Sequence, residues 1–158
     1  MSSQRVLHDH FFREAKRNGY RSRAAYKLLE IDDRRDILRK KDYVLDLGAA
    51  PGSWLQVASK CVGPRGKVIG VDLKEIDNLQ LDNVTIMQED VTELSLDTFG
   101  DDTVFDVILS DMAPNTTGNR TIDHHCSVRL CHTALDIAAT LLRPKGNLVM
   151  KVLEGEAY

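Results

Sequence analysis

Residues 44–54, VLDLGAAPGSW, run from a short apolar strand through a glycine-rich turn into the first turn of a helix. Gly48 and Gly52 allow the backbone of this turn to approach a ligand closely, and the small side chains of Ala49 and Ala50 leave room for it. A turn that cradles a pyrophosphate would need the spacing G-x-G-x-x-G, which GAAPG does not have. The stretch therefore predicts a site at the end of a buried strand for a ligand other than a phosphate group.

Strands and helices alternate from this stretch onward. Short apolar strands are predicted at residues 43–47, 67–73, 84–87, 104–110 and 147–153, and helices at 53–62 and from Thr121 or Asp123 to Leu142. Repeated βα units with apolar strands form parallel sheets that are covered on both faces. The predicted fold class is therefore α/β, a doubly wound, mostly parallel sheet with helices on both faces, and ligands of such sheets bind beyond the carboxyl ends of the strands.

The composition is that of a single domain. The chain has 158 residues, 42% of them hydrophobic and 28% charged, and no uncharged apolar run approaches the roughly 20 residues of a membrane span. We therefore expect no transmembrane segment, and the N-terminal residues lack the apolar stretch of a signal peptide. Three cysteines, an odd number, indicate no disulfide framework. We expect a reducing, intracellular setting, which is the cytoplasm or, in a eukaryote, the mitochondrion or nucleolus.

The charge is divided unevenly along the chain. Residues 1–41 carry 12 Lys and Arg against 6 Asp and Glu, whereas residues 42–158 carry 9 against 18. A basic segment beside an acidic body is common in proteins that contact a polyanion, although a solvated basic helix would show the same charge. We therefore divide the chain into a basic N-terminal helical arm, 1–41, packed on a domain, 42–158.

The arm is predicted to hold two helices. The first ends at residues 18–19, Asn-Gly, a pair typical of helix C-termini. The second runs from Arg23 to about Ile31 and is capped by Ser22. Because Arg23 and Lys27 lie one turn apart, this helix presents two cations along one side.

Two acidic residues stand at consecutive strand ends. Asp72 ends the second strand in GVDL, where a carboxylate can accept hydrogen bonds from both hydroxyls of a ribose, and Asp90 follows the third strand in QEDV. Either acid alone is equally explained as a turn or cap residue. Together with the glycine-rich turn they favour a nucleoside cofactor. Trp54 is a candidate to pack near it, although a single Trp at a helix start is also typical of the core.

Asp111 and Lys151 stand at the ends of the fourth and fifth strands. Asp111 opens SDMAPN, and Lys151 lies in LVMKVL, where a cation is costly unless it is paired. A structural ion pair between adjacent strand ends explains these residues as well as a catalytic pair does. Either interpretation brings the two side chains together.

The motifs taken together resemble one family. VLDLGAAPGSW resembles motif I of S-adenosylmethionine-dependent methyltransferases. With YRSRAAYKL, GVDL, SDMAPN and VMKV, in this order and spacing, essentially the whole chain resembles the FtsJ/RrmJ family of RNA 2′-O-ribose methyltransferases. The resemblance implies a Rossmann-like methyltransferase fold and a Lys-Asp-Lys-Glu catalytic tetrad, of which Lys27, Asp111 and Lys151 match the first three members, with Lys151 as the proton acceptor.

The resemblance also implies S-adenosylmethionine as the cofactor, with Asp90 placed to meet the adenine amino group. The cofactor-binding positions are then Asp46, Gly48, Ala49, Ala50, Pro51, Gly52, Trp54, Asp72, Leu73, Asp90, Val91 and Asp111.

The implied chemistry requires a base. A ribose 2′-hydroxyl is a weak nucleophile that must lose its proton as it attacks the sulfonium methyl group. A lysine accepts a proton only when neutral. Burial of Lys151 in its strand and the positive charge of Lys27 favour the neutral amine, whereas Asp111 opposes them and orients the amine. Proximity of hydroxyl and methyl group supplies much of the rate, and no metal is required.

The chain departs from the family pattern at its end. The fourth tetrad member, a Glu on a later strand, has no counterpart, because Glu154 and Glu156 follow Lys151 too closely. Family members continue with a helix and two more strands, without which the fifth strand is an apolar, uncovered sheet edge. We therefore expect a chain truncated at its C-terminus, and the activity of these 158 residues is left open.

Basic and aromatic residues of the arm are candidates for RNA contact. Phe11, Phe12 and Tyr20 are placed among them for base stacking, and the loop 115–120 is a candidate to close over the target nucleotide. Any single arginine is equally explained as solvated surface. The predicted phosphate contacts are Arg13, Lys16, Arg17, Arg21 and Arg23, with Arg5 beside them.

A group of His and Cys residues at 124–132 has ligand types that zinc accepts, but it contains no C-x-x-C and its two cysteines fall on different helix faces. We therefore predict no metal site there, with a core-facing Cys131 and exposed histidines.

The sequence favours one function and leaves others open. The favoured function is methyl transfer from S-adenosylmethionine to a ribose 2′-hydroxyl of RNA, a uridine of large-subunit ribosomal RNA above all. The partner is then ribosomal RNA or a large ribosomal subunit, the oligomeric state is open with a monomer favoured, and no membrane partner is expected. The alternatives are ribose methylation of tRNA or of an mRNA cap, and a catalytically weak cofactor-binding module that binds RNA or assists ribosome assembly.

Overall fold

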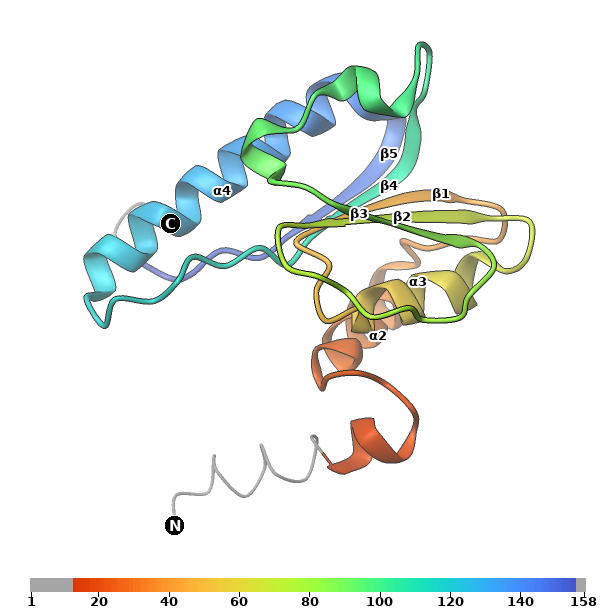
Figure 1. The fold of residues 1–158 in the computed structure, drawn as a ribbon, viewed down its shortest axis with the longest axis horizontal. Coiled ribbons are helices and arrows are strands. Elements are labelled where there is room, and N and C mark those ends of the chain that lie inside the picture. The colour runs from red at the N-terminus through yellow and green to blue at the C-terminus, as the bar shows by residue number, and fades with distance from the viewer. Residues whose placement is uncertain (1–12, 156–158) are drawn as a thin grey trace.

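The computed structural model, which describes residues 13–155, contains one sheet of five parallel strands (Figure 1). In spatial order the strands are β3 (Val84–Gln88), β2 (Lys67–Asp72), β1 (Tyr43–Leu47), β4 (Phe105–Ser110) and β5 (Leu142–Met150). The first strand, β1, is central, and the later strands are added outward on both of its sides. The predicted doubly wound α/β fold is therefore confirmed. The order reverses between β1 and β4, which is where sheets of this kind bind ligands.

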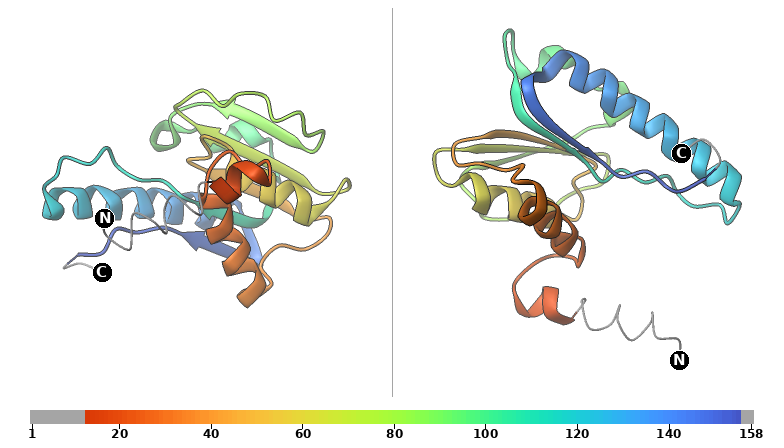
Figure 2. Two further views of the ribbon diagram at one scale, coloured as in Figure 1. Left: turned by 90° about the horizontal axis from the view of Figure 1, so that it is seen from below. Right: turned by 180° about the vertical axis from the view of Figure 1, so that it is seen from behind.

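Helices cover both faces of the sheet, as Figures 1 and 2 show. α2 (Ala24–Arg35) and α3 (Ser53–Val62) lie on one face. α4 (Arg120–Leu141) lies on the other, together with the 3₁₀ turns η1 (Val91–Glu93) and η2 (Leu96–Phe99). Each face has its own buried hydrophobic cluster, one under α2 and α3 and one under α4.

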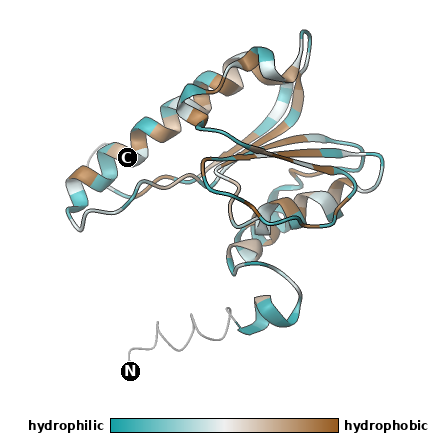
Figure 3. Cartoon of the chain, viewed as in Figure 1, coloured by the Kyte–Doolittle hydropathy of each residue, from teal (hydrophilic) through white to brown (hydrophobic). Residues whose placement is uncertain are grey.

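The central strand β1 shows why the sheet forms. Its residues from Val44 to Leu47 are fully buried, because both faces of a parallel sheet are covered. Val44 packs in the cluster under α2 and α3, whereas Leu45 and Leu47 pack in the cluster under α4. In Figure 3 the strands are coloured mainly as hydrophobic, whereas the short helix over residues 13–17 is mostly hydrophilic.

The second part of the arm contributes to the core. Ala25 and Leu28 of α2 are fully buried, and Ile37 and Leu38 just after the helix are nearly so. α2 extends one turn beyond its predicted end. In this last turn, Asp32 Oδ1 accepts hydrogen bonds from the amides of Ile37 and Leu38, at 3.0 and 2.9 Å, and so holds the segment that follows the helix.

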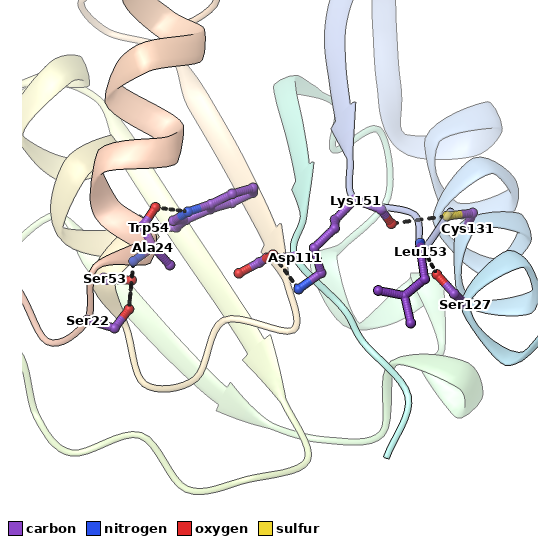
Figure 4. Close-up of polar contacts among 9 residues, drawn as sticks. All are labelled: Ser22, Ala24, Ser53, Trp54, Asp111, Ser127, Cys131, Lys151 and Leu153. Atoms are coloured by element: carbon purple, nitrogen blue, oxygen red, sulfur yellow. Dashed lines mark hydrogen bonds and ion pairs between the residues drawn. The ribbon is translucent and has the colours of Figure 1, made fainter. Parts of the chain in front are cut away.

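The predicted N-cap of α2 is wrong by one residue. Arg23 is the N-cap and makes no capping hydrogen bond through its side chain. The Oγ of Ser22 accepts a hydrogen bond from Ala24 N at 3.3 Å and lies 2.8 Å from Ser53 Oγ (Figure 4). Ser22 therefore joins the beginnings of α2 and α3.

The last strand begins and ends earlier than the sequence indicated. Leu142 already pairs with Phe105, and a shift of register precedes the pairing of Asn147 with Val107. β5 ends at Met150, so the prediction that Lys151 lies inside the strand is wrong. The side chain of Lys151 is 40% exposed rather than buried. β5 is an edge strand of the described sheet, as predicted.

Within the described part of the chain, no helix combines the length and the apolar character needed to cross a membrane.

Candidate active site

Residues that follow the carboxyl ends of all five strands line one cavity of about 650 Å³. This is the position at which parallel α/β sheets bind ligands. Seven of the predicted cofactor positions lie in its wall: Gly48, Ala50, Asp72, Leu73, Asp90, Val91 and Asp111. The predicted base Lys151 lines the same cavity.

The glycine-rich turn is held tightly against its neighbours. Gly48 has a φ of +75°, and a Cβ placed on it would lie 2.6 Å from Met112 Cγ. The amides of Gly48 and Ala49 both donate to Val71 O, at 2.8 and 3.1 Å. Gly52, at the start of α3, has a φ of +112°. Both glycines therefore occupy backbone conformations that residues with a side chain rarely adopt.

Asp72 connects this turn to the end of β2. Its Oδ2 accepts a hydrogen bond from Ala50 N at 2.9 Å, and its Oδ1 accepts one from Lys74 N at 2.8 Å. Each carboxylate oxygen can accept a second hydrogen bond. Asp72 therefore fixes the turn and still has acceptor capacity for the hydroxyls of a ribose.

Asp90 serves as a cap and a cavity residue at once. Its Oδ1 accepts hydrogen bonds from Thr92 Oγ1 at 2.7 Å and Thr92 N at 2.9 Å, and these bonds lower the pKa of the Asp90 carboxyl. The carboxyl group is therefore ionised, with its second oxygen available as an acceptor. Asp90 is therefore a turn residue, and its place in the cavity wall leaves the predicted contact with a ligand open.

Asp46 is a fully buried carboxyl group near two of the cavity acids. Neither of its oxygens has a hydrogen-bond partner among the described residues. Burial, followed by the negative charges of Asp111 and Asp72, raises the pKa of Asp46 well above its usual value. A protonated carboxyl without a partner is a donor and acceptor that a polar group of a ligand would satisfy.

A pH-dependent stability follows from Asp46. The folded protein retains a proton that the unfolded chain releases above its pKa of 3.8, so folding becomes less favourable as the pH rises from there toward the raised pKa. We expect Asp46→Asn to remove this loss. Between pH 3.8 and the raised pKa, the free energy of unfolding of the variant minus that of the wild type should then increase by up to about 1.4 kcal/mol per pH unit. Urea unfolding at about pH 4, 5.5 and 7 measures the gain. A difference between the two proteins that is constant with pH would contradict the assignment.

The Asp111 and Lys151 side chains form an ion pair across one wall of the cavity. Lys151 Nζ lies 2.7 Å from Asp111 Oδ1, and Figure 4 shows the two side chains pointing toward each other. The backbone supports this contact, because Asp111 N donates to Leu47 O at 3.3 Å and Lys151 N donates to Ser110 O at 2.9 Å. The pair is partly exposed, with 27% of the Asp111 side chain and 40% of the Lys151 side chain accessible. A substrate in the cavity can therefore reach it.

A family model described as FtsJ-like methyltransferase matches residues 20–158. The chain belongs to the FtsJ-like methyltransferase family. It is 47% identical to ribosomal RNA large subunit methyltransferase E of Syntrophobacter fumaroxidans, over 97% of this chain and 79% of that protein. It is 45% identical to the protein of the same name from Pseudomonas aeruginosa, over 99% of this chain and 79% of that protein.

A solved structure supports the same assignment. The structure named as a ribosomal RNA methyltransferase from Plasmodium falciparum superposes with a TM-score of 0.77 at 33% identity, covering 87% of this chain and 80% of that one. The predicted family and the predicted Rossmann-like methyltransferase fold are therefore confirmed.

Lys27, the first tetrad position of the FtsJ-like pattern, lies outside the cavity wall. It is exposed on α2, and none of the contacts among the described residues joins it to Asp111 or Lys151. Trp54 lies in the core and is 5% exposed. Its Nε1 donates to Ala24 O at 2.8 Å, which ties α2 to α3 (Figure 4). Trp54 thus supports the helix that carries Lys27.

The other predicted cofactor positions of the turn also lie outside the wall. Asp46, Ala49 and Gly52 are buried next to it, and Pro51 is exposed. The wall of the FtsJ-like cavity is therefore formed by alternate residues of the turn, Gly48 and Ala50.

Arg21 makes its contacts within the protein. Its guanidinium donates to the backbone carbonyls of Asp77, Asn78 and Pro51, at 2.5, 2.9 and 3.3 Å. Its amide donates to Gln56 Oε1 at 2.9 Å. Arg21 therefore connects the glycine-rich turn to the loop that follows β2.

The remaining candidates for RNA contact are surface residues of the arm. Arg13, Lys16, Arg17 and Arg23 are exposed, with Arg23 engaged in a contact inside the protein. Gly19 has a φ of +78°, as its predicted role at a helix end requires. Arg5, Phe11 and Phe12 lie outside the described residues.

Sequence reasoning missed the part of the wall that α4 provides. Cys126, Arg129 and Leu130 line the cavity, and their spacing of three and four residues puts them on one helix face. Lys74, directly after the loop residue Leu73, was missed as well. The helix face could have been found by extending the apolar pattern of α4 toward the cavity side.

The His and Cys residues of α4 do not gather into a metal site. In the part of the chain that the structure describes, no group of three or more His, Cys, Asp or Glu residues is arranged to hold an ion. The prediction of exposed histidines is wrong for His124, which is 2% exposed. The prediction that no metal is needed remains a prediction.

Proposed function

We propose that this chain transfers the methyl group of S-adenosylmethionine to a ribose 2′-hydroxyl of RNA, and that its preferred target is a uridine of large-subunit ribosomal RNA. The observation that carries the proposal is the Asp111–Lys151 pair, with a distance of 2.7 Å, on the wall of the cavity that also contains Asp72 and Asp90. One cavity thus combines acceptors for a nucleoside with a group able to take up a proton.

The residues of the cavity fit the proposed cofactor. Asp72 would accept hydrogen bonds from the ribose hydroxyls, and Asp90 would accept one from the adenine amino group. Leu73, which is 66% exposed in the cavity wall, and Val91 would contact the adenine ring. Gly48 lines the cavity without a side chain and so leaves room for the methionine part. When bound, the cofactor supplies an electrophilic methyl group on a sulfonium.

Lys151 and Asp111 would handle the proton of the target hydroxyl. Lys151 Nζ would take that proton as the hydroxyl oxygen attacks. Asp111 holds Nζ in place and stabilises the ammonium group that results. The partial exposure of both side chains leaves room for a ribose to approach them from the cavity.

The choice of ribosomal RNA rests on the relatives. Two that match more than 95% of this chain are named as ribosomal RNA large subunit methyltransferases. The exposed cations of the arm, Arg13, Lys16 and Arg17, suit phosphate groups on either side of a target nucleotide. The cytoplasmic location and the monomeric state stay part of this proposal.

A substrate comparison tests the RNA class. Purified protein and labelled cofactor are incubated with large-subunit ribosomal RNA, assembled large subunits, tRNA and capped mRNA. We expect label in the large-subunit RNA or the assembled subunit, at least about tenfold above the other two, since base or shape contacts that fail in the wrong substrate lose about 1.4 kcal/mol or more. Label found mainly in tRNA or in the mRNA cap would contradict ribosomal RNA as the substrate and identify that RNA in its place. Binding of RNA without any label would favour the catalytically weak RNA-binding module.

A further inference from the structure

Residues 151–155 leave the sheet after β5 and run along α4 (Figure 4). The register between β4 and β5 ends with Ser110 opposite Met150. Beyond this pair, side chains of α4 contact the backbone polar groups that a neighbouring strand would otherwise bind. Cys131 Sγ donates to Lys151 O at 3.3 Å, and Leu153 N donates to Ser127 Oγ at 2.8 Å. The backbone of the predicted base is thus held from the helix side.

His124 extends this row of contacts. Its Nδ1 lies 2.7 Å from Leu153 O, and because a carbonyl oxygen only accepts, Nδ1 carries the hydrogen. A Cβ on Gly155 would overlap the imidazole ring, so the backbone packs directly on His124. His124 is 2% exposed and Ser127 is 1% exposed. Buried polar groups in a row of this kind are usually paired for a structural or functional reason.

The three helix residues share one face. His124, Ser127 and Cys131 are separated by three and four residues, which places them one above the other along α4. They contact the carbonyl of Lys151 and both the amide and the carbonyl of Leu153. With the bond from Lys151 N to Ser110 O on the other side, the backbone of Lys151 is fixed at both of its polar groups.

We propose that this face of α4 positions Lys151 for the reaction. The inference rests on the proposed function, in which Lys151 Nζ takes the proton of the target hydroxyl. Misplacing a reacting group by about 1 Å can lower a rate by about 10²-fold. The Lys151 side chain is long and 40% exposed, so its own packing does not fix the position of the Lys151 backbone. The hydrogen bonds from α4 hold this backbone instead, in a position from which Nζ can contact Asp111.

Ser127→Ala tests the proposal, because it removes the acceptor of Leu153 N without adding volume. We expect kcat to fall about tenfold or more, while the dissociation constant of S-adenosylmethionine and the KM for RNA change by less than about twofold. We also expect the Leu153 amide to exchange its hydrogen about tenfold faster. Kinetics at saturating RNA and hydrogen exchange followed by NMR measure these changes.

Ser59→Ala is the matched control. Ser59 is also a buried serine on a helix, 7% exposed, and its Oγ donates to Asn83 Oδ1 at 2.5 Å, away from the cavity. We expect this variant to be less stable but to keep the wild-type kcat. An equal fall of kcat in both variants would reduce the role of Ser127 to general stability and overturn the proposal.

Cys131 offers a rescue by a conservative change. Cys131→Ser keeps a hydrogen-bond donor facing Lys151 O and is expected to keep kcat within about twofold of the wild type. Cys131→Ala removes the donor and is expected to lower kcat several-fold. If the serine and alanine variants have the same kcat, the contact does not position Lys151.

One readout is independent of activity. The NMR signal of the Lys151 side chain, assigned by its loss in Lys151→Arg, depends on its distance from Asp111. We expect this signal to shift in Ser127→Ala and to stay in place in Ser59→Ala. An unshifted signal in Ser127→Ala together with faster exchange at Leu153 would overturn the proposal. If the wild-type protein methylates no RNA, the proposed function fails, and a shifted signal still supports the positioning of Lys151 by α4.

Discussion

Lys151→Ala is expected to lower kcat for methyl transfer to RNA by about 10³-fold. General-base catalysis by a positioned side chain contributes about 10²–10⁴-fold, and the substitution removes Nζ, the atom proposed to take the proton of the hydroxyl. The affinity for S-adenosylmethionine is expected to stay within about threefold, because Asp72 and Asp90, not Lys151, are proposed to hold the nucleoside part. Incorporation of a labelled methyl group at saturating RNA measures the rate, and calorimetry measures the affinity.

Two further variants control this prediction. Lys151→Arg keeps a positive charge beside Asp111, but a guanidinium does not lose its proton at neutral pH, so the variant is expected to be as slow as Lys151→Ala. Lys145→Ala removes an exposed lysine earlier in β5 and is expected to keep the full rate. Wild-type rates in both Lys151 variants would show that another group accepts the proton.

Asp72→Ala is expected to weaken the binding of S-adenosylmethionine by about 10²-fold or more. A hydrogen bond to a charged group contributes about 1.5–3 kcal/mol, and Asp72 is proposed to accept two from the ribose. The substitution also leaves Ala50 N without its acceptor, so the turn loses its connection to the end of β2. Calorimetric titration with the cofactor measures the dissociation constant.

Asp77→Ala is the matched control for Asp72. Asp77 is an exposed acid on the loop that follows β2, and its side chain does not line the cavity. The variant is expected to bind the cofactor as the wild type does. Asp72→Asn, which keeps one carboxamide oxygen as an acceptor, is expected to fall between the wild type and Asp72→Ala. Equal affinity in the wild type and in all three variants would show that Asp72 does not bind the cofactor.

The strands and helices nearest the glycine-rich turn were predictable to the residue. β1 and α3 begin and end as predicted, since an apolar run bounded by glycines on one side and polar residues on the other leaves little choice. The ends of α4 and β5 were not predictable to the residue. Residues 142–146 contain both Pro144 and Gly146, and their pattern does not say that Leu142 already pairs with β4.

The placement of individual side chains was less predictable. The pattern LVMKVL predicts a strand that includes Lys151, but where a ladder ends depends on the partner strand, and β4 ends at Ser110. Arg21 was grouped with the phosphate-binding residues because it is a cation in a basic segment. In the structure its guanidinium donates to three backbone carbonyls that come together only in the folded chain, which the sequence did not indicate.

The residues around the base depend on contacts between distant parts of the chain. His124 was predicted to be exposed, as the alternative to a metal site in this part of the chain. It is buried since residues 151–155 pack on that face of α4, and no local pattern in either segment indicates the contact. The motifs thus predicted seven cavity-lining cofactor positions and Lys151. The wall that α4 provides and the contacts behind Lys151 became visible only in the fold.

The position of the methyl group in the product tests the central claim most directly. Large-subunit ribosomal RNA is incubated with the purified protein and the cofactor, digested to nucleosides and analysed by mass spectrometry. We expect one 2′-O-methylated nucleoside, a uridine, with the added mass on the ribose fragment, and its absence when Lys151→Ala replaces the wild type. A methyl group on a base fragment, or equal yields from the two proteins, would contradict the assignment of this cavity to ribose methylation.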